Sequence, residues 1–167
     1  MKRYSFLALA SVFLLSVLCV CSVSQAANTI KVGIVDTYTG PATTFTNDVL
    51  DGFKLAVQKI NASGGILGKK IEFTTRDEKF KPDIGLAMAK ELVLKEKVDI
   101  LMGTINSATT LAISDFVKKE KVPFFVTFAK SDKIVAEKGH RYIFNMNESR
   151  FQLVKGPVFT NVLLADE

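Results

Sequence analysis

The sequence predicts an α/β fold built on a doubly wound parallel sheet. Short apolar runs alternate four times with segments of helical periodicity along the 167 residues. The clearest unit spans 98–114, where an apolar run ends at Gly103 and a polar turn leads into a helical pattern. Strands that alternate with helices imply βαβ units with right-handed crossovers. In such sheets, ligands bind at the carboxyl ends of the strands.

Five apolar runs are the expected strands. They are short, as is typical of strands that helices cover on both faces of a sheet. They span residues 30–35, 71–75, 98–102, 122–128 and 142–146.

Several segments between these runs have helical features. The first helix is expected after 46–48, any residue of which could act as an N-cap, and to end in the glycine-containing stretch 61–65. The second opens at Pro82, which suits a first helical turn, and runs to about Lys97. A short helix is expected over 131–137.

The turn after Gly103 is the first candidate for a binding site. It contains four residues whose types suit helix N-caps: Asn106, Ser107, Thr109 and Thr110. The start of a helix leaves free backbone N–H groups and a partial positive charge, which together favour a carboxylate or a phosphate. Three loops should share this rim because they follow parallel strands, and they comprise residues 36–46, 103–107 and 127–133.

Residues 1–26 have the features of a secretory signal peptide. A basic start precedes an apolar stretch over 6–23, and the small residues at 24–26 resemble a cleavage site. We therefore expect export and cleavage after this leader, with an uncleaved membrane anchor as the alternative. A lipid anchor at Cys21 is disfavoured because Val20 is a poor residue before a lipidated cysteine.

Composition narrows the class of protein. Both cysteines lie in the leader, so the rest of the chain has no disulfide framework. The net charge is +5, of which the leader contributes +2, and Lys and Glu are scattered along the expected helices. No arginine stripe with interleaved aromatics occurs, so a nucleic-acid partner is not expected.

Motifs for catalysis, metals and cofactors are weak or absent. The stretch 64–70 resembles a phosphate-binding loop, but it follows a helix and lacks Ser or Thr after Lys69, which favours a simple turn. No glycine fingerprint for a dinucleotide follows the first strand. His140 is the only histidine and lies on a charged stretch, which favours a surface residue over a metal or triad role. Asp77 and Glu78 are interpreted as rim or loop charges rather than acid–base groups.

Three stretches of the chain resemble one known family. They are IKVGIVDTYTGP at the first strand, DGFKLAVQKINASGGILGKKIEF across the first helix and second strand, and VDILMGTINSATTLAISDFVKKEKVPFFV, with a Gly-Pro pair later. In order and spacing they resemble the N-terminal part of a type I periplasmic solute-binding protein of the branched-chain amino-acid (leucine, isoleucine and valine) ABC transporter class. The resemblance covers nearly the whole chain after residue 26.

The resemblance implies a domain organisation. The family fold has two Rossmann-like α/β lobes, which crossover strands join and which close on the ligand. Residues 27–148 would form the first, ligand-binding lobe. Residues 149–167 would form the crossover and the first helix of a second lobe that is otherwise missing, together with that lobe's ligand contacts.

The resemblance also implies a ligand site on the loops of the first lobe, where the family holds the carboxylate and ammonium groups of an amino acid. Ser107 would bind the carboxylate through its hydroxyl and N–H, Ala129 would offer a carbonyl, and Phe45 would cover the ligand side chain. The six matching positions are Phe45, Ile105, Asn106, Ser107, Ala129 and Ser131.

Two residues depart from the family pattern in this region. Phe128 replaces a smaller residue or a proline that is common there. Lys130 lies within the binding loop, where it could favour an extra anionic group on the ligand or could simply point into solvent.

Together these features predict the extracytoplasmic solute-binding component of an ABC importer. Such a protein is periplasmic, binds an amino acid or a similar small carboxylate, and delivers it to the membrane permease subunits. It is not an enzyme and requires no metal or cofactor. Two alternatives stay open: a periplasmic sensor or regulator with the same fold, and a secreted flavodoxin-like enzyme, for which neither a cofactor motif nor a nucleophile–base pair is found.

Overall fold

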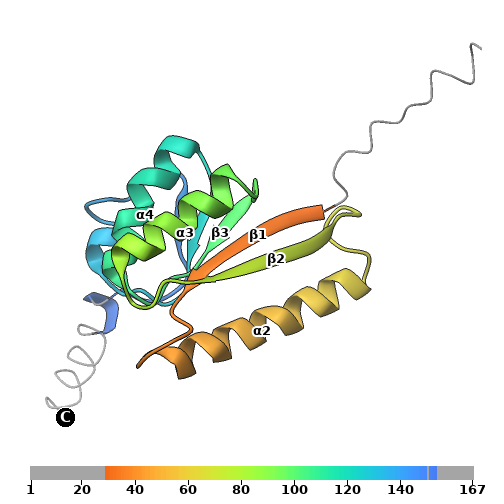
Figure 1. Cartoon of the computed structure of the whole chain (residues 1–167), viewed down its shortest axis with the longest axis horizontal. Helices are drawn as coiled ribbons and strands as arrows, with labels where there is room; N and C mark the ends of the chain where they lie inside the picture. Colours follow the sequence, from red (N-terminus) through yellow and green to blue (C-terminus); the bar gives the residue numbers. More distant parts are fainter. Residues whose placement is uncertain (1–28, 150, 154–167) are drawn as a thin grey trace, which may run out of the picture.

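A five-stranded sheet forms the centre of the computed structural model, which describes residues 29–149 and 151–153. All neighbouring strands are parallel and lie in the order β2-β1-β3-β4-β5 (Figure 1). Their bounds are β1 (Thr29–Asp36), β2 (Lys70–Asp77), β3 (Ile100–Met102), β4 (Phe124–Val126) and β5 (Ile143–Asn145). The predicted fold class is confirmed. The predicted leader (1–26) and nearly all of the predicted crossover (149–167) lie outside the described residues.

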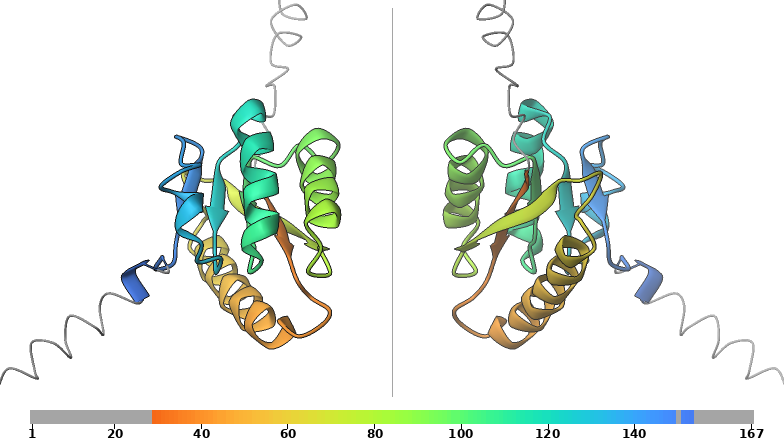
Figure 2. Two further views of the ribbon diagram at one scale, coloured as in Figure 1. Left: turned by 90° about the vertical axis from the view of Figure 1, so that its left-hand side faces the viewer. Right: turned by 90° about the vertical axis from the view of Figure 1, so that its right-hand side faces the viewer.

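Helices cover both faces of the sheet. In chain order they are α2 (Thr43–Ala62), α3 (Pro82–Leu94), α4 (Ser107–Glu120) and a short 3₁₀ helix η1 (Asp132–Ile134). Helix α2 lies on one face, whereas α3 and α4 lie side by side on the other (Figures 1 and 2). Within the part of the chain that the structure describes, no helix is long and apolar enough to cross a membrane.

Strand β1 supplies side chains to both layers because alternate residues of a strand point to opposite faces. Val32 and Ile34 pack with Val57 of α2 and Ile71 of β2. Val35 belongs to a larger apolar cluster on the other face. Its fully buried members come from α3, α4, β3, β4 and η1: Ala89, Leu92, Leu101, Ile113, Val117, Phe124, Val126 and Ile134.

The start of α2 differs from the prediction. The helix begins at Thr43, and its N-cap Ala42 has no side-chain cap, so capping by 46–48 is wrong. The physical reason is that the Thr46 hydroxyl donates to the Thr37 carbonyl of the loop after β1 instead. At its other end, Gly64 adopts a φ of 98°, as the glycine-containing stretch predicts.

The other boundaries shift by a few residues. Helix α3 begins at Pro82 as predicted but ends at Leu94, three residues before the predicted end. Strands β1 and β2 are longer than expected, whereas β4 and β5 are only three residues each. The expected helix over 131–137 is one 3₁₀ turn. The stretch 64–70 is a turn closed by an Ile66–Lys69 bridge, which agrees with the simple-turn interpretation.

The face on the side of α2 is incompletely covered at the β4–β5 edge. Phe125 and Phe144 stack there with their ring centroids 5.0 Å apart, and Phe144 is 44% exposed. Helix α2 packs against β1 and β2 at the other edge. In the described part of the chain, the apolar surface of β4 and β5 on this face is therefore left to solvent.

Gly33 offers a test of the packing between the sheet and α3. A Cβ at this position would lie 3.0 Å from Leu92 Cδ1 and 3.1 Å from Leu101 Cδ2, and both leucines are fully buried. We expect Gly33→Val to lower the free energy of unfolding by about 1–3 kcal/mol because it overpacks this contact.

Urea unfolding followed by circular dichroism would measure this effect. The matched control is Gly52→Ala on α2, where a Cβ meets nothing within 4 Å. It should raise the free energy of unfolding by up to about 1 kcal/mol because alanine favours a helix over glycine. Equal stability of Gly33→Val and the unmodified chain would contradict the tight packing of α3 on β1.

Candidate functional site

Three loops meet at the carboxyl ends of the strands, as predicted, and the side chain of Asp36 connects them. Its Oδ1 atom accepts hydrogen bonds from the backbone N–H groups of Thr37 and Ile105, both at 2.9 Å. Its Oδ2 atom lies 3.5 Å from the Thr127 hydroxyl. The loops after β1, β3 and β4 therefore contact one buried carboxylate, which is 2% exposed.

Backbone hydrogen bonds join the β3 and β4 loops directly. The N–H of Thr127 donates to the Gly103 carbonyl at 3.1 Å, and the N–H of Ala129 donates to the Thr104 carbonyl at 3.0 Å. Gly103 has a φ of 120°, and a Cβ there would lie 1.8 Å from the carbonyl oxygen of Val35. Only glycine allows the chain to leave β3 this close to β1.

The N-terminus of α4 lies at this rim. Asn106 is its N-cap, and the side-chain oxygen accepts from the N–H of Ala108 at 2.9 Å. Its amide nitrogen donates to the Phe80 carbonyl at 3.2 Å. Asn106 is thus occupied in holding the turn. Ser107 is the first residue of the helix and is half-buried, and its hydroxyl bonds to no other described residue.

A hollow of about 390 Å³ opens beside this helix start. Two of its lining residues, Ser107 and Ser131, are among the six predicted ligand-binding positions. The other lining residues are Asp132, Lys133 and Glu137. Ser107, at the start of α4, and Ser131 therefore lie on one concave surface. The N–H of Ser107 and the two hydroxyls can donate hydrogen bonds to the oxygens of a small anion.

None of the four remaining predicted positions lines this hollow, and Asn106, described above, is one of them. Ile105 is half-buried and gives its N–H to Asp36, whereas Ala129 is 1% exposed and gives its N–H to Thr104. Phe45 is 55% exposed at the start of α2, and its ring centroid lies 5.6 Å from that of Phe128. Ligand contacts by these residues stay predictions.

Lys130 has partners within the chain. Its Nζ lies 2.8 Å from Glu148 Oε1 and 5.3 Å from the centroid of the Phe128 ring. The ion pair with Lys130 lowers the pKa of Glu148. The two alternatives for Lys130, a contact with a ligand anion or a side chain in solvent, stay predictions beside this internal ion pair.

Sequence reasoning underestimated the acidic residues behind the rim. Glu78, interpreted as a rim or loop charge, is fully buried, and its Oε1 accepts from the Thr37 hydroxyl at 2.8 Å. Its Oε2 and the hydroxyl of neighbouring Thr109 have no well-formed hydrogen bond among the described residues. Burial raises the pKa of Glu78, and the charges of Asp36 and Asp77 raise it further, whereas the nearby hydroxyls of Thr109 and Thr37 oppose this shift.

Asp36 and Asp77 differ in pKa although both end a strand of the sheet. Burial raises the pKa of Asp36, and the hydrogen bonds from Thr37, Ile105 and Thr127 only partly oppose it. At Asp77, burial also favours the neutral acid, but hydrogen bonds from Thr39, Lys79 and Tyr38 outweigh it and lower the pKa. The one sequence signal for these acids was their position directly after an apolar strand.

His140 also differs from the prediction of a surface residue. The ring is half-buried, and Nε2 lies 3.0 Å from the Ser114 hydroxyl and 3.1 Å from the Ser114 carbonyl. The histidine therefore joins the loop before β5 to α4. Among the residues that the structure describes, no group of three or more His, Cys, Asp and Glu is placed to hold a metal ion.

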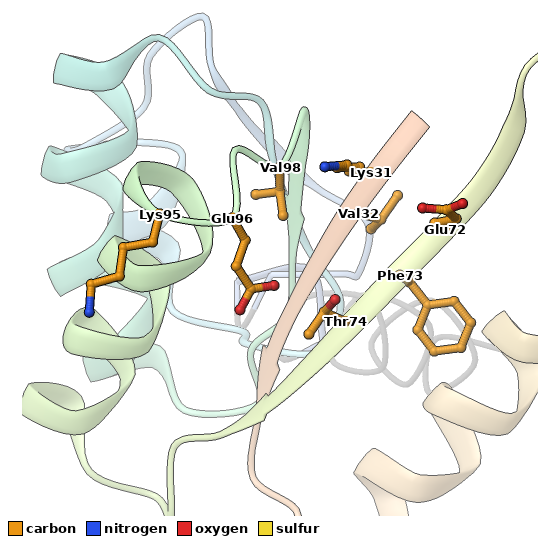
Figure 3. Close-up of a pocket in the computed structure, with 8 residues that line it drawn as sticks. All are labelled: Lys31, Val32, Glu72, Phe73, Thr74, Lys95, Glu96 and Val98. Carbon is orange, nitrogen blue, oxygen red and sulfur yellow. The ribbon is translucent and has the colours of Figure 1, made fainter. Parts of the chain in front are cut away.

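A separate hollow of about 450 Å³ lies near the amino ends of β1 and β2 (Figure 3). Its charged lining residues are two lysines and two glutamates: Lys31, Lys95, Glu72 and Glu96. The Lys95 side chain extends away from the strands (Figure 3), and Glu96 is paired with Arg76. This hollow lies at the amino ends of the strands, away from the three loops, so the candidate site is placed at the carboxyl rim.

Comparison with known proteins identifies the family of the chain. The sequence profile of a family described as periplasmic binding protein matches residues 29–158. An amino acid binding protein of Pseudomonas aeruginosa is 29% identical over 144 residues, which cover 85% of this chain and 38% of that protein. A leucine-specific-binding protein of Salmonella typhimurium is 26% identical over 98% of this chain and 42% of its own length. The chain thus spans about two fifths of these curated relatives.

Solved structures give the same result. The branched-chain amino acid transporter substrate binding protein of Streptococcus pneumoniae, in complex with isoleucine, has a TM-score of 0.67 and 31% identity over 72% of this chain and 34% of that chain. A solute binding protein of an ABC transporter from Rhodopseudomonas palustris, in complex with 4-hydroxybenzoate, has a TM-score of 0.64 and 33% identity over 74% of this chain and 33% of that chain.

The buried carboxyl of Glu78 predicts a pH-dependent stability. Its pKa in the folded chain is raised above the ordinary 4.5, so its contribution to stability is lost as the pH rises through the folded value. In Glu78→Gln, the amide keeps an acceptor for Thr37 and adds a donor toward Thr109. We expect its melting temperature to exceed that of the unmodified chain at pH 8 by a few degrees, since about 1 kcal/mol shifts such a domain by about 4 °C.

Thermal unfolding between pH 4 and pH 8 would measure this gain, which should fade as the pH falls through 4.5, because the carboxyl then becomes neutral in the unfolded as well as in the folded state. Glu72→Gln is the matched control because Glu72 is exposed on β2, the strand that precedes Glu78, and should show no such gain. A gain that is independent of pH would contradict the burial of a titrating Glu78.

Proposed function

The chain belongs to the periplasmic binding protein family, and we propose that it is the first lobe of an extracytoplasmic solute-binding protein of an ABC importer. Its ligand is a small carboxylate, either an amino acid or an aromatic acid. The observation that carries the proposal is the hollow shared by Ser107 and Ser131, at the N-terminus of α4 and at the carboxyl ends of the strands.

A carboxylate would be bound by the hydrogen-bond donors at the start of α4, because the charged lining residues Asp132, Lys133 and Glu137 supply no net positive charge. The N–H of Ser107 lies in the first turn of α4, where a helix offers no internal acceptor. The hydroxyls of Ser107 and Ser131 can each donate a second hydrogen bond to the same oxygens. Positive charge at the helix start adds an attraction that a neutral ligand would not use.

The aromatic pair at the rim supports a ligand with an apolar body. The Phe45 and Phe128 rings are 5.6 Å apart, and the exposed Phe45 ring can cover an apolar group. Isoleucine and 4-hydroxybenzoate, the molecules bound in the two solved structures, both combine a carboxylate with an apolar body. The two ligand classes are therefore both compatible with this rim.

Binding in this proposal needs a second lobe. Small-molecule pockets typically enclose about 70–90% of their ligand, and one lobe supplies only one side. The membrane subunits of the transporter are the proposed partners, and export directed by residues 1–26 would bring the chain to the periplasm. An importer is preferred to a sensor because the solved structures above are named as parts of ABC transporters. No enzymatic step is proposed.

The first test is ligand binding by the chain itself. Isoleucine and 4-hydroxybenzoate, titrated into ¹⁵N-labelled chain, should shift the amide signals of Ser107 and Ala108 with a Kd nearer mM than μM, a deficit of ~4 kcal/mol against a micromolar site. Ser107→Ala should weaken this binding about tenfold because a hydrogen bond to a charged group is lost.

Ser63→Ala is the matched control for this substitution. Ser63 is exposed at the end of α2, far from the rim, and should leave the affinity unchanged. Unaltered affinity in Ser107→Ala would show that the carboxylate site is misplaced. Micromolar binding by the chain would overturn the requirement for a second lobe.

A second test separates the two ligand classes. Phe45→Ala removes the exposed ring of the aromatic pair, so it should weaken binding of 4-hydroxybenzoate more than binding of isoleucine, by about threefold to tenfold, because aromatic pairs add about 0.5–1.5 kcal/mol beyond burial. The same titration measures both ligands. Leu55→Ala, which alters another exposed apolar residue of α2, is the control. Equal losses for the two ligands would argue against stacking on Phe45.

A further inference from the structure

Asp36 is too deeply buried to be a ligand contact, yet it contacts every loop of the rim. Its carboxylate bonds to Thr37 after β1 and Ile105 after β3, and it lies 3.5 Å from the Thr127 hydroxyl after β4. Among the described residues, this combination of near-complete burial and contact with three ligand loops is found at no other side chain in the hydrogen bonds above.

We propose that Asp36 is the positioning residue of the ligand site: it fixes the turn from Ile105 to Ser107 against β1 and so sets the direction in which Ser107 meets the ligand. The inference rests on the function proposed above, because it assumes that Ser107 binds the ligand. It assigns to Asp36 a role in affinity without any contact to the ligand.

The chain geometry explains how one bond can control the helix start. Ile105 directly precedes the N-cap Asn106, and Ser107 follows as the first helical residue. Asn106 anchors the far side of the turn through Phe80 of the loop after β2. The bond from Ile105 N–H to Asp36 anchors the near side, so the turn is held at both ends.

The charge of Asp36 explains why this anchor is strong. A buried carboxylate is costly unless donors compensate it, and two backbone N–H groups at 2.9 Å offset part of that cost here. Hydrogen bonds to a charged acceptor are roughly twice as strong as neutral ones. Asparagine could accept the same two N–H groups without a charge, and the Thr127 hydroxyl could accept from its amide nitrogen.

Two variants of Asp36 distinguish a role in positioning Ser107 from a role in stability alone. Asp36→Ala removes the anchor, and we expect the amide signals of Ile105 and Ser107 to shift and the affinity for isoleucine or 4-hydroxybenzoate to fall about tenfold to a hundredfold. Asp36→Asn should restore the affinity to within about threefold of the unmodified chain because both N–H bonds are kept. Titrations monitored by ¹⁵N spectra measure all of these quantities.

Asp99→Ala is the matched control. The Asp99 carboxylate also accepts a backbone N–H, that of Lys31 at 2.8 Å, but it lies near the amino end of β1. It should lower stability without moving the Ile105 and Ser107 signals or the affinity. An Asp36→Ala variant that behaves like Asp99→Ala, with lower stability only, would overturn the proposal.

A measurement on the unmodified chain covers the case in which Asp36→Ala does not fold. A scalar coupling across the hydrogen bond, between the Ile105 amide nitrogen and the Asp36 carboxyl carbon, should be detectable in ¹⁵N,¹³C-labelled protein. Its absence would overturn the proposal. These amide measurements need no ligand, so they test the bond between Ile105 and Asp36 even if the chain binds neither isoleucine nor 4-hydroxybenzoate. A failure to bind either molecule would count against the proposed function instead.

Discussion

The burial of one carboxylate at the end of β1 is the constraint on which the rim depends. A parallel sheet brings the carboxyl ends of its strands to one edge, but it does not determine how the loops beyond them are arranged. Strands β3 and β4 have only three residues each, so they hold their loops weakly. The bonds that Asp36 accepts from Thr37 and Ile105 supply the order that these short strands cannot.

The three acidic residues behind the rim are all carboxylic acids, but their pKa values shift differently because their environments differ. Asp77 has three donors and a lowered pKa. Glu78 is fully buried, one of its oxygens has no well-formed hydrogen bond among the described residues, and burial raises its pKa. Asp36 has good donors but almost no exposure, and burial raises its pKa as well. The chain therefore bears an electrostatic cost directly behind the three loops of the rim.

Local patterns were predictable from the sequence, and long-range contacts were not. The strand-turn-helix over 98–114 depends on neighbours, as in the Asn106 cap two residues before Ala108, and it was predicted correctly. The bond from Ile105 to Asp36 joins residues 69 apart, and that from Thr37 to Glu78 joins residues 41 apart. Burial of an acid depends on such distant donors, so a sequence with an acid after a strand cannot distinguish an exposed rim charge from a buried anchor.

The candidate ligand residues also divide into those that local structure positions and those that depend on long-range contacts. Ser107 and Ser131 line one hollow because helix and strand ends place them there, while the Phe45 ring packs against Phe128, a residue that departs from the family pattern. Lys130 covers the Phe128 ring and pairs with Glu148, next to the segment predicted to cross to another lobe. Under the proposed function, the aromatic side of the site is therefore tied to the crossover, whereas its carboxylate side is tied to Asp36. Specificity for the ligand body and affinity for its carboxylate would then depend on different parts of the chain.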